Sequence, residues 1–356
     1  MNAVSVALAP KRAQKFKEII TGKRNFTVLI SHVDPDSLAS AFTMIYLIKM
    51  LVPACQVKMF YAGSVGRRQN ESIIAKYGLK NEMKPISDFG DTDCQNIILV
   101  DSSKMNDIRF GNVASVITEP IVIVDHHDGS TFTEDESSFY LVELIGSAST
   151  LMEELFLALG FNLDQLDLKL YAMLAIGIYS DTKALSSASS RDLKAYEVIT
   201  NHVKYGELNE FIYYSLPSSH YNNMAYALVH RSLNRGRLVA SAGFLPPEQG
   251  DDLASIADYL IREETVHVVV IWAIVGDTVQ IKARCDSTFN ISLCVFLEKS
   301  FGTGSGAKTT PNGSGEGGAS LQIKLSDWIT SPEPDEDTKK ALLFLIDTRI
   351  KQLVFA

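Results

Sequence analysis

Several acidic and histidine side chains in the N-terminal half are of the types that ligate divalent cations. Metal-assisted hydrolysis of a phosphoester needs oxygen ligands and imidazoles that converge from several strands, with one carboxylate that bridges two cations. The chain supplies such a set in His32, Asp34, Asp36, Asp101, Asp125, His126, His127 and Asp181. A single Asp at a strand end is more often a helix cap or a turn former. The coincidence of so many ligand types favours a metal centre.

Short apolar runs precede most of these residues. Residues 26–31, 97–100 and 121–124 are rich in β-branched side chains, and each run leads into acidic or histidine residues. Such runs, separated by helix-length segments, are typical of buried parallel strands. Ligands of an open α/β sheet bind beyond the carboxyl ends of its strands. We therefore predict an α/β fold whose N-terminal domain is a mostly parallel sheet flanked by helices, with three strand ends meeting at one crevice.

The second half of the chain predicts a smaller α/β domain. Strands are expected at 237–244, 266–275 and 278–284, with a helix at 253–261. Residues 301–320 are rich in Gly, Ser and Thr, a composition that would suit a flexible linker. Because an apolar strand is expected immediately afterwards, at 321–325, a structured ligand loop is at least as well supported.

The predicted domain order is a catalytic metal-binding domain at 1–205, a linker at 206–222 and a substrate-binding domain at 223–330. The last segment, 331–356, opens with acids that suit a helix N-terminus and continues with Leu342, Ile346, Ile350 and Leu353 at helical spacing. We expect this amphipathic helix to pack on its own domain, with a homodimer contact as the minority alternative. The active site is expected in the cleft between the two domains.

Composition and charge restrict the function classes. The 356 residues are enough for two ordinary domains. A net charge of -9 disfavours binding of a long duplex nucleic acid and suits a small phosphate ligand held by metal ions. The apolar tract 41–57 contains Lys49 and Pro53, so a membrane span is disfavoured, and the N-terminus lacks the order of a secretory signal. We expect a cytoplasmic protein with no membrane partner.

Four sequence blocks resemble the DHH phosphoesterase family, which includes inorganic pyrophosphatases, single-strand exonucleases and nanoRNases. They are His-x-Asp-x-Asp followed by Ser-Leu-Ala-Ser at 32–40, Val-Asp-Ser-Ser at 100–103, Val-Asp-His-His at 124–127 and Gly-Ile-Tyr-Ser-Asp-Thr at 177–182. Their order and spacing span the N-terminal half. The C-terminal half resembles the small domain that accompanies the DHH domain in nanoRNases and related phosphodiesterases.

The resemblance implies which ion each ligand would hold. His32 and Asp34 would bind one ion, Asp36, His126 and Asp181 would bind the other, and Asp101 would bridge both. Two cations ~3.5–4 Å apart lower the pKa of a shared water toward ~7, which would supply a bridging hydroxide as nucleophile. Ligation by carboxylates and imidazoles without thiolate suits two Mn²⁺ ions, with Mg²⁺ or Co²⁺ as alternatives.

The resemblance also implies two roles next to the metals. His127 would face the substrate phosphate, where it would donate a hydrogen bond or assist the leaving group. Asp125 would fix the tautomer of an imidazole, as metal-bound histidines usually require. Asp101, His127 and Asp125 are therefore the predicted catalytic residues.

Substrate contacts are predicted in both halves. Arg68 and Asn70 resemble a segment that lies near the substrate in nanoRNase-like members, although an Arg pair at 67–68 is more often a solvated surface feature. Arg284 would end a strand as a phosphate-binding or base-stacking residue, and Gly315, Gly317 and Gly318 would let backbone N–H groups approach a nucleotide. Many relatives follow these glycines with a His that meets the base. This chain has no His after His267, and Glu316 is one candidate for that place.

The predicted function is a two-metal phosphoesterase that trims short oligonucleotides or dinucleotides to mononucleotides in either direction, as nanoRNases do, with 3′-phosphoadenosine 5′-phosphate as a further substrate. A phosphodiesterase for linear or cyclic signalling dinucleotides, such as pGpG or c-di-AMP, is the alternative within the same family. From another class, a non-catalytic nucleotide-sensing module would keep the pocket without turnover. A pyrophosphatase is less well supported because that branch lacks the glycine-rich loop.

Overall fold

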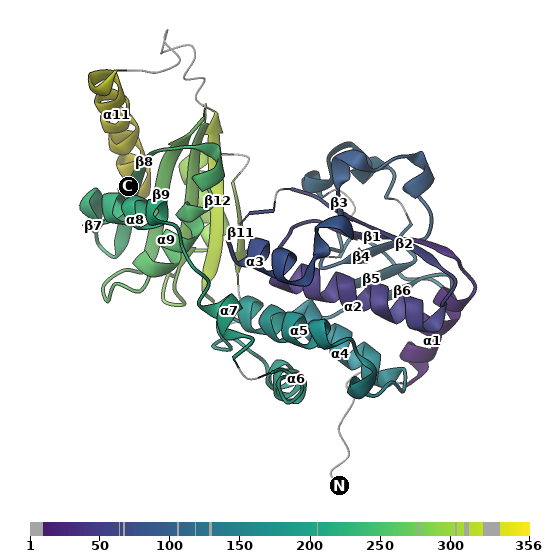
Figure 1. Cartoon of the computed structure of the whole chain (residues 1–356). Coiled ribbons are helices and arrows are strands. Elements are labelled where there is room, and N and C mark those ends of the chain that lie inside the picture. Colours follow the sequence, from purple (N-terminus) through teal and green to yellow (C-terminus); the bar gives the residue numbers. More distant parts are fainter. Residues whose placement is uncertain are drawn as a thin grey trace. The chain divides into compact units, whose positions relative to one another are not determined.

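The structure of the protein, a computed structural model, describes residues 10–63, 65–66, 68–104, 107–117, 119–127, 130–204, 206–276, 278–302, 305–309, 313–322 and 335–356. Contacts within the chain divide it into two compact units, Met1–Ser215 and Leu216–Ala356, here called the N-terminal and C-terminal units. Each unit is built around its own six-stranded sheet (Figure 1).

The sheet of the N-terminal unit is parallel throughout, in the order β3-β2-β1-β4-β5-β6. Its strands are β1 (Asn25–Ile30), β2 (Gln56–Tyr61), β3 (Lys84–Pro85), β4 (Ile97–Val100), β5 (Val122–Asp125) and β6 (Phe139–Val142). The three strands predicted from apolar runs are β1, β4 and β5, within one residue of their expected bounds. Both β4 and β5 are buried along their whole length, which explains why their sequences are uninterrupted apolar runs.

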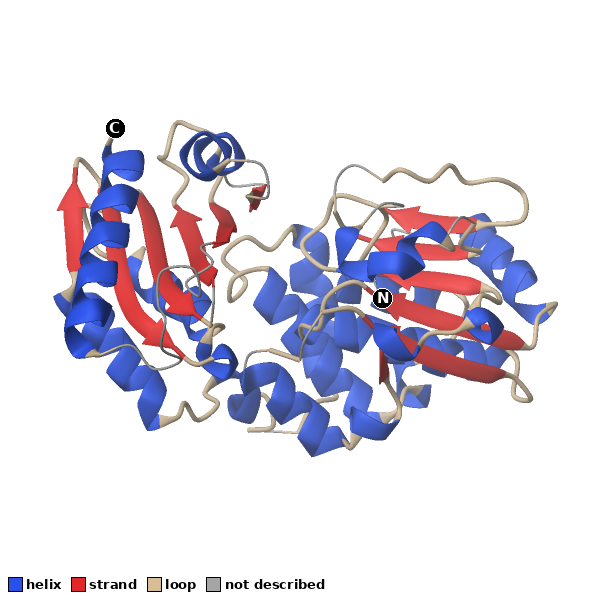
Figure 2. Cartoon of the chain, turned by 90° about the horizontal axis from the view of Figure 1, so that it is seen from above, coloured by secondary structure: helices blue, strands red, loops and turns tan. Residues whose placement is uncertain are grey.

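Helices cover one face of this sheet, and short 3-10 segments cover the other. The helices of the unit are α1 (Pro10–Thr21), α2 (Pro35–Leu51), α3 (Arg68–Tyr77), α4 (Ala148–Ala158), α5 (Leu168–Asp181), α6 (Ser190–Thr200) and α7 (Asn209–Ile212). The larger core joins α1, α2, α4 and α5 to the inward side chains of the strands. On the opposite face Leu29, Leu99 and Ile123 pack against Phe110 and Ile117. The predicted α/β architecture is confirmed, and Figure 2 shows the strands side by side with helices packed on them.

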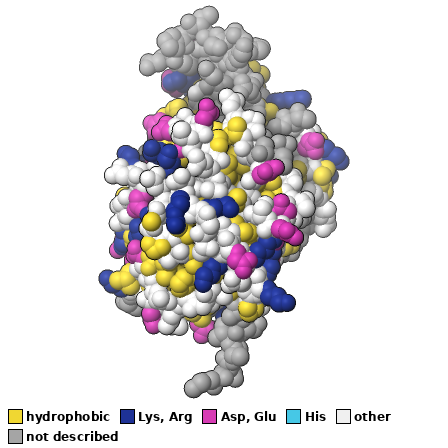
Figure 3. Space-filling view, turned by 90° about the vertical axis from the view of Figure 1, so that its right-hand side faces the viewer, with side chains coloured by type: hydrophobic (Ala, Val, Ile, Leu, Met, Phe, Trp, Pro, Cys, Tyr) yellow, Lys and Arg dark blue, Asp and Glu magenta, His cyan; other side chains and the backbone are white. Residues whose placement is uncertain are grey.

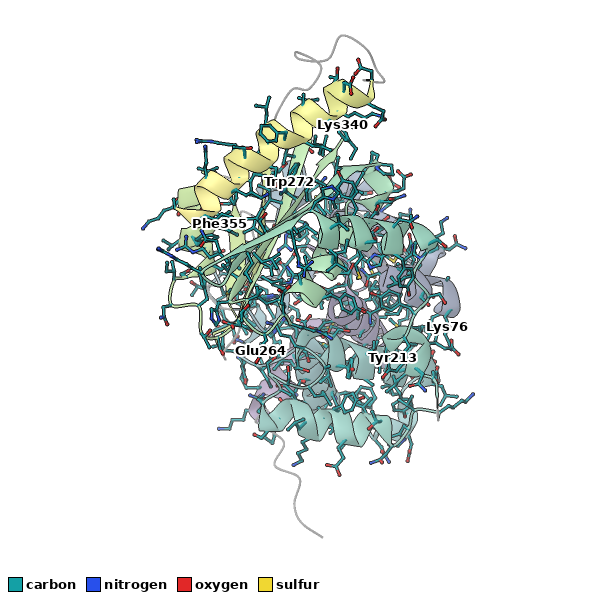
Figure 4. The ribbon with its side chains drawn as sticks, turned by 90° about the vertical axis from the view of Figure 1, so that its left-hand side faces the viewer. Lys76, Tyr213, Glu264, Trp272, Lys340 and Phe355 are labelled. Carbon is teal, nitrogen blue, oxygen red and sulfur yellow. The ribbon has the colours of Figure 1, made fainter. Side chains whose placement is uncertain are left out.

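The C-terminal unit has a mixed sheet in the order β11-β12-β10-β9-β8-β7, in which only the β8 and β9 pair is parallel. Its strands are β7 (Arg231–Asn234), β8 (Arg237–Leu245), β9 (Val268–Val275), β10 (Thr278–Cys285), β11 (Gly306–Thr309) and β12 (Gly315–Gln322). One core contains α9 (Asp252–Leu260) and Ala227 of α8 (Ser218–Val229). A second core contains α10 (Leu293–Phe301) and α11 (Glu336–Phe355), with Trp272 of β9 fully buried in it (Figure 4).

The C-terminal helix packs on the sheet of its own unit. Ile346, Ile350 and Val354 of α11 are buried in the same core as Trp272. Phe344 and Leu345 of the same helix stay exposed. The homodimer contact stays a prediction.

The glycine tract differs from the sequence prediction. Gly315, Gly317 and Gly318, expected in a loop before a strand at 321–325, lie inside β12 and pair with β10. Residues 323–325 lie outside the described part of the chain. Glycine is depleted in strands, so the sequence pattern did not indicate a strand at these residues.

At two of these positions glycine is required because neighbouring groups leave no room for a Cβ. A Cβ on Gly317 would come 2.5 Å from the carbonyl oxygen of Gly306 and 2.8 Å from Leu297. A Cβ on Gly318 would come 2.5 Å from the carbonyl oxygen of Ile281. Close packing accounts for glycine at these positions, and their contact with a nucleotide stays a prediction.

The boundary region is more helical than a linker suggests. The predicted linker at 206–222 contains α7 and the first residues of α8, and the division between the two units falls within it, after Ser215. The domain bounds drawn from the sequence stay predictions. None of the described helices has the length and apolar character needed to cross a membrane.

Candidate functional site

The loop after β1 is fixed by the first turn of α2. Asp34 is the N-cap of this helix: its carboxylate accepts a hydrogen bond from the backbone N–H of Ser37 at 2.9 Å. Ser37 returns the contact, because its Oγ accepts from the backbone N–H of Asp34 at 3.0 Å and donates to the carbonyl oxygen of His32 at 2.7 Å. The capping role that a lone Asp usually has is thus real for Asp34, and it holds the segment that carries His32 in one conformation.

Asp36 is fully buried and is held by another helix. Its two carboxylate oxygens accept hydrogen bonds from the backbone N–H groups of Ala148 at 2.7 Å and Ser149 at 2.8 Å, the first residues of α4. A helix N-terminus stabilises such an anion. Burial nevertheless raises the pKa of Asp36 well above its usual range, and the neighbouring carboxylates of Asp181 and Asp101 raise it further. A cation placed among these carboxylates would relieve both effects.

His126 presents one ring nitrogen to this acidic cluster. Its Nδ1 lies 3.1 Å from the carbonyl oxygen of Ile145, so the tautomer that donates there carries its lone pair on Nε2. That Nε2 lies 3.1 Å from Asp181 Oδ2, 3.2 Å from Asp101 Oδ1 and 3.8 Å from Asp36 Oδ2. Burial disfavours the imidazolium, but the Asp101 and Asp181 carboxylates outweigh it and hold the pKa of His126 well above its usual range.

The buried Nε2 atom is a test of whether a metal fits here. It forms no regular hydrogen bond although three carboxylates surround it. A lone pair facing carboxylates needs a positive charge between them, either a proton or a metal ion. Oxygen and imidazole donors in this number are what divalent cations such as Mn²⁺ take. The residues therefore fit the predicted metal.

Asp101 follows β4 in an unusual backbone conformation. Its φ is +54°, in the left-handed region that few residues other than glycine adopt, and Asp and Asn are among the exceptions. Its backbone N–H donates to the carbonyl oxygen of Val124 at 2.8 Å, which ties the turn to β5. Such strain often accumulates at functional sites.

The described ligands form two overlapping groups. One is Asp36, His126 and Asp181, and the other is Asp101, His126 and His127, with ligand atoms in each group within 4.8 Å of one another. Asp36 and Asp181 thus come together with His126 as the resemblance implies. Within the described residues, neither group includes His32 or Asp34, whose assignment to a second ion stays a prediction.

His127 is oriented by Asp125. The Asp125 carboxylate lies 2.7 Å from Nδ1 of His127 and also accepts from the backbone N–H of that residue at 3.2 Å. Ser103 Oγ donates to the second oxygen of the same buried carboxylate. The imidazole of His127 is therefore held from one side, beside the ring of His126 at a centroid distance of 4.2 Å.

Arg109 is a charged neighbour that the sequence motifs did not reveal. It follows Asp107, to whose carboxylate its Nε donates at 2.8 Å, in the 3-10 segment Ile108–Ser115 after β4. Burial lowers the pKa of the guanidinium, but Asp107, and after it Asp101 and Asp34, outweigh this and raise it. Its only sequence signal was a basic residue a few positions after a strand-end Asp.

The predicted substrate residues of the N-terminal unit have other contacts. Asn70 is buried, and its amide donates to the carbonyl oxygens of Val33 at 2.7 Å and Gly66 at 2.8 Å. It therefore fastens the backbone between His32 and Asp34. Arg68 is exposed and pairs with Glu71 at 2.8 Å.

Arg284 in the C-terminal unit is buried among acids. Its Nε donates to Asp258, its Nη1 donates to the carbonyl oxygen of Ala283 at 3.0 Å, and its Nη2 lies 3.5 Å from a carboxylate oxygen of Glu316. Burial lowers the pKa of this guanidinium, and Asp258 and Glu316 raise it. A phosphate at this place would have to compete with two carboxylates. The substrate role of Arg284 stays a prediction.

Comparison with known proteins finds a family match within the N-terminal unit. Residues 27–178 match the family model described as "DHH family, N-terminal domain". The uncharacterized protein MJ1633 of Methanocaldococcus jannaschii is 24% identical over 305 residues, which are 83% of this chain and 59% of that protein. The chain thus spans less than two thirds of the length of this curated relative.

One solved structure shows the same fold at low identity, and a second superposes less well. An exopolyphosphatase-related protein from Bacteroides fragilis superposes with a TM-score of 0.69 and 13% identity, covering 98% of this chain and 99% of that one. RecJ from Thermus thermophilus, in complex with Mn²⁺, reaches a TM-score of 0.48 with 10% identity, covering 96% of this chain and 54% of RecJ. At 13% identity the likeness to the Bacteroides fragilis protein concerns the fold alone.

Proposed function

Because its N-terminal unit is a DHH-family domain, we propose that this protein is a two-metal phosphoesterase that hydrolyses short oligonucleotides or dinucleotides to mononucleotides. The observation that carries the proposal is the buried Nε2 of His126, which faces Asp36, Asp101 and Asp181 and has no regular hydrogen bond. This donor set suits Mn²⁺, with Mg²⁺ or Co²⁺ as alternatives.

The residues of the site would have separate roles in the hydrolysis. Divalent cations held here would activate water and neutralise charge on the phosphoryl group. Asp101 contacts both His126 and His127, so it is the carboxylate best suited to bridge two ions. His127, oriented by Asp125, would in its protonated form donate from Nε2 to a phosphate oxygen or pass that proton to the leaving group. Arg109 adds positive charge beside Asp101 and Asp34.

The charge of the chain supports a small substrate. The net charge of -9 opposes a long polyanion. On the face shown in Figure 3, basic and acidic side chains are interspersed, and no broad basic patch covers it. A short nucleotide, with few phosphates to neutralise, agrees better with this surface than a long duplex.

A substrate panel tests the proposal. Protein stripped with chelator is reloaded with Mn²⁺ and given 3′-phosphoadenosine 5′-phosphate, dinucleotides, five-residue oligonucleotides and polyphosphate. We expect metal-dependent release of mononucleotides, fastest with the shortest oligonucleotides. Turnover restricted to polyphosphate, the substrate class that the name of the Bacteroides fragilis protein suggests, would contradict the nucleotide assignment.

Two alternatives have separate outcomes. Exclusive cleavage of linear or cyclic dinucleotides would assign a signalling phosphodiesterase of the same family. A non-catalytic nucleotide sensor would bind mononucleotides with Mn²⁺ but release no product. The presence of Asp36, Asp101, His126 and Asp181 in one cluster favours an enzyme over a sensor.

A further inference from the structure

A buried carboxylate outside the ligand cluster makes contacts that a simple helix cap does not need. Asp192 of α6 is fully buried. Its Oδ2 accepts from the backbone N–H of Ser189 at 2.8 Å and from Ser189 Oγ at 2.6 Å, which completes the capping box of its own helix. The same carboxylate also reaches another segment: Oδ2 accepts from the backbone N–H of Gly146 at 3.1 Å, and Oδ1 accepts from Thr150 Oγ1 at 2.7 Å.

The segment that Asp192 reaches, residues 145–149, holds two candidate metal ligands by its backbone. The carbonyl oxygen of Ile145 lies 3.1 Å from Nδ1 of His126. The N–H groups of Ala148 and Ser149 hold both oxygens of Asp36. Gly146, which binds Asp192, lies between these two anchoring points.

Gly146 is also packed against the residue that follows a third ligand. A Cβ at this position would come 2.5 Å from Asp192 Oδ2 and 2.6 Å from Cγ2 of Thr182. Thr182 is fully buried and comes directly after Asp181. The backbone at residue 146 is therefore confined between Asp192 and the end of α5.

We propose that Asp192 is a positioning residue that fixes segment 145–149 and, through it, the geometry of His126 and Asp36 at the metal centre. The inference rests on the proposed function, because positioning matters only if these residues bind metal. Partners of this kind, which orient ligands without touching the ion, typically change metal affinity about 10–100-fold when they are removed. A pure capping role would use Ser189 alone and would leave metal affinity unchanged.

The role depends on hydrogen-bond acceptance, which an amide can reproduce. In Asp192→Asn, the amide oxygen would accept from Gly146 and Ser189, and the amide nitrogen would donate to Thr150 Oγ1. Thr150 Oγ1 could then donate to Ser147 Oγ, which lies 3.0 Å away. Asp192→Ala removes all of these contacts.

The test compares Mn²⁺ affinity with stability. Wild type, Asp192→Asn, Asp192→Ala and Ser189→Ala are stripped of metal, titrated with Mn²⁺ by calorimetry, and unfolded thermally without metal. We expect Asp192→Ala to bind Mn²⁺ about 10–100-fold more weakly and Asp192→Asn to bind close to wild type. Ser189→Ala, the capping control, should lose stability but keep its affinity.

Each other outcome has a definite meaning. If Asp192→Ala is destabilised but binds Mn²⁺ like wild type, Asp192 is only a cap and the inference is wrong. If Asp192→Asn is as weak as the Ala variant, the negative charge matters and positioning is rejected. If Asp192→Ala does not fold, Thr150→Val removes the Oδ1 contact and the hydroxyl contact with Ser147 but keeps Oδ2 on Gly146, and it should still weaken Mn²⁺ binding. If wild type binds no Mn²⁺, the proposed function itself fails, and the inference with it.

Discussion

Oδ1 of Asp125 lies 2.7 Å from Nδ1 of His127, so the carboxylate determines which nitrogen of that imidazole carries the proton. The tautomer that donates to Asp125 has its lone pair on Nε2. Since Ser103 Oγ holds the other carboxylate oxygen, the carboxylate itself has little freedom to turn.

Asp125→Asn should therefore lower turnover more than it lowers metal affinity. In the Asn variant the amide oxygen would still accept from the backbone N–H and Nδ1 of His127, and the amide nitrogen would face Ser103 Oγ, but a neutral amide stabilises a protonated imidazole less than a carboxylate does. We expect kcat to fall about 10–100-fold, measured in steady state with Mn²⁺ and a dinucleotide. Ser103→Ala, which keeps the Asp125–His127 contact, is the matched control and should lose less activity. An Asn variant with wild-type kcat would show that the charge of Asp125 does not contribute to the action of His127.

Asp101→Asn should abolish hydrolysis while the protein stays folded. Asn tolerates the left-handed backbone at this position, whereas Asp101→Ala should cost a further ~1–2 kcal/mol of unfolding free energy. Both variants should bind Mn²⁺ weakly, measured by calorimetry beside urea unfolding. Equal activity of wild type and Asp101→Asn would end the enzyme assignment.

Gly177→Ala should disturb the site by crowding it. A Cβ at residue 177 of α5 would come 2.4 Å from Ser149 Oγ and 3.1 Å from Cα of Asp36. Overpacking of this kind usually costs about 1–3 kcal/mol, and here it should also weaken Mn²⁺ binding. Gly22→Ala, where nothing lies within 4 Å of the new Cβ, is the control and should change neither quantity. Unchanged Mn²⁺ affinity in Gly177→Ala would mean that α5 and Asp36 can shift without affecting the metal.

Glu153→Gln should make the protein less sensitive to rising pH. Burial raises the pKa of this α4 side chain from 4.5 to about 7, with a smaller contribution from Glu154 and an opposing one from Lys194. The folded chain therefore holds the proton more tightly than the unfolded chain, and folding stability falls as pH rises from 4.5 to about 7. The loss amounts to about 3 kcal/mol at most.

Urea unfolding at pH 6 and pH 8.5 measures this effect. The wild type should lose stability between the two values, and Glu153→Gln should lose less. Glu154→Gln is the comparison, because Glu154 pairs with Arg191 and its loss should lower stability at both values, while it removes only the smaller of the two contributions that raise the pKa of Glu153. Parallel pH profiles of wild type and Glu153→Gln would show that this carboxyl titrates normally.

The strand ends of the N-terminal unit could be predicted because their signals are local. The runs that became β1, β4 and β5 consist mostly of buried apolar side chains, and each leads into acidic or histidine residues. The meeting of Asp36, Asp101 and His126 followed from the rule that parallel strands end at one edge. Asp181, the last residue of α5, was placed by the resemblance of its motif alone.

Other features depend on contacts between distant segments, which one sequence does not display. Asp36 is held by backbone amides more than a hundred residues away, and backbone groups have no residue signature. The strand formed by Gly315–Gln322 was hidden because its glycines serve packing against Gly306 and Leu297. Arg284 reads as an anion ligand in the sequence, whereas Asp258 already holds it in the fold.

The hydrogen bonds from the first residues of α4 to Asp36 also affect which cation the site can bind. Amide hydrogens already occupy one lone pair on each carboxylate oxygen, and the side chain cannot rotate without breaking both contacts. Of the two oxygens, Oδ2 lies 3.8 Å from Nε2 of His126, so a cation shared with that imidazole would meet this carboxylate through Oδ2. Calcium, which often takes carboxylates by both oxygens in large, flexible shells, would be at a disadvantage against smaller octahedral ions.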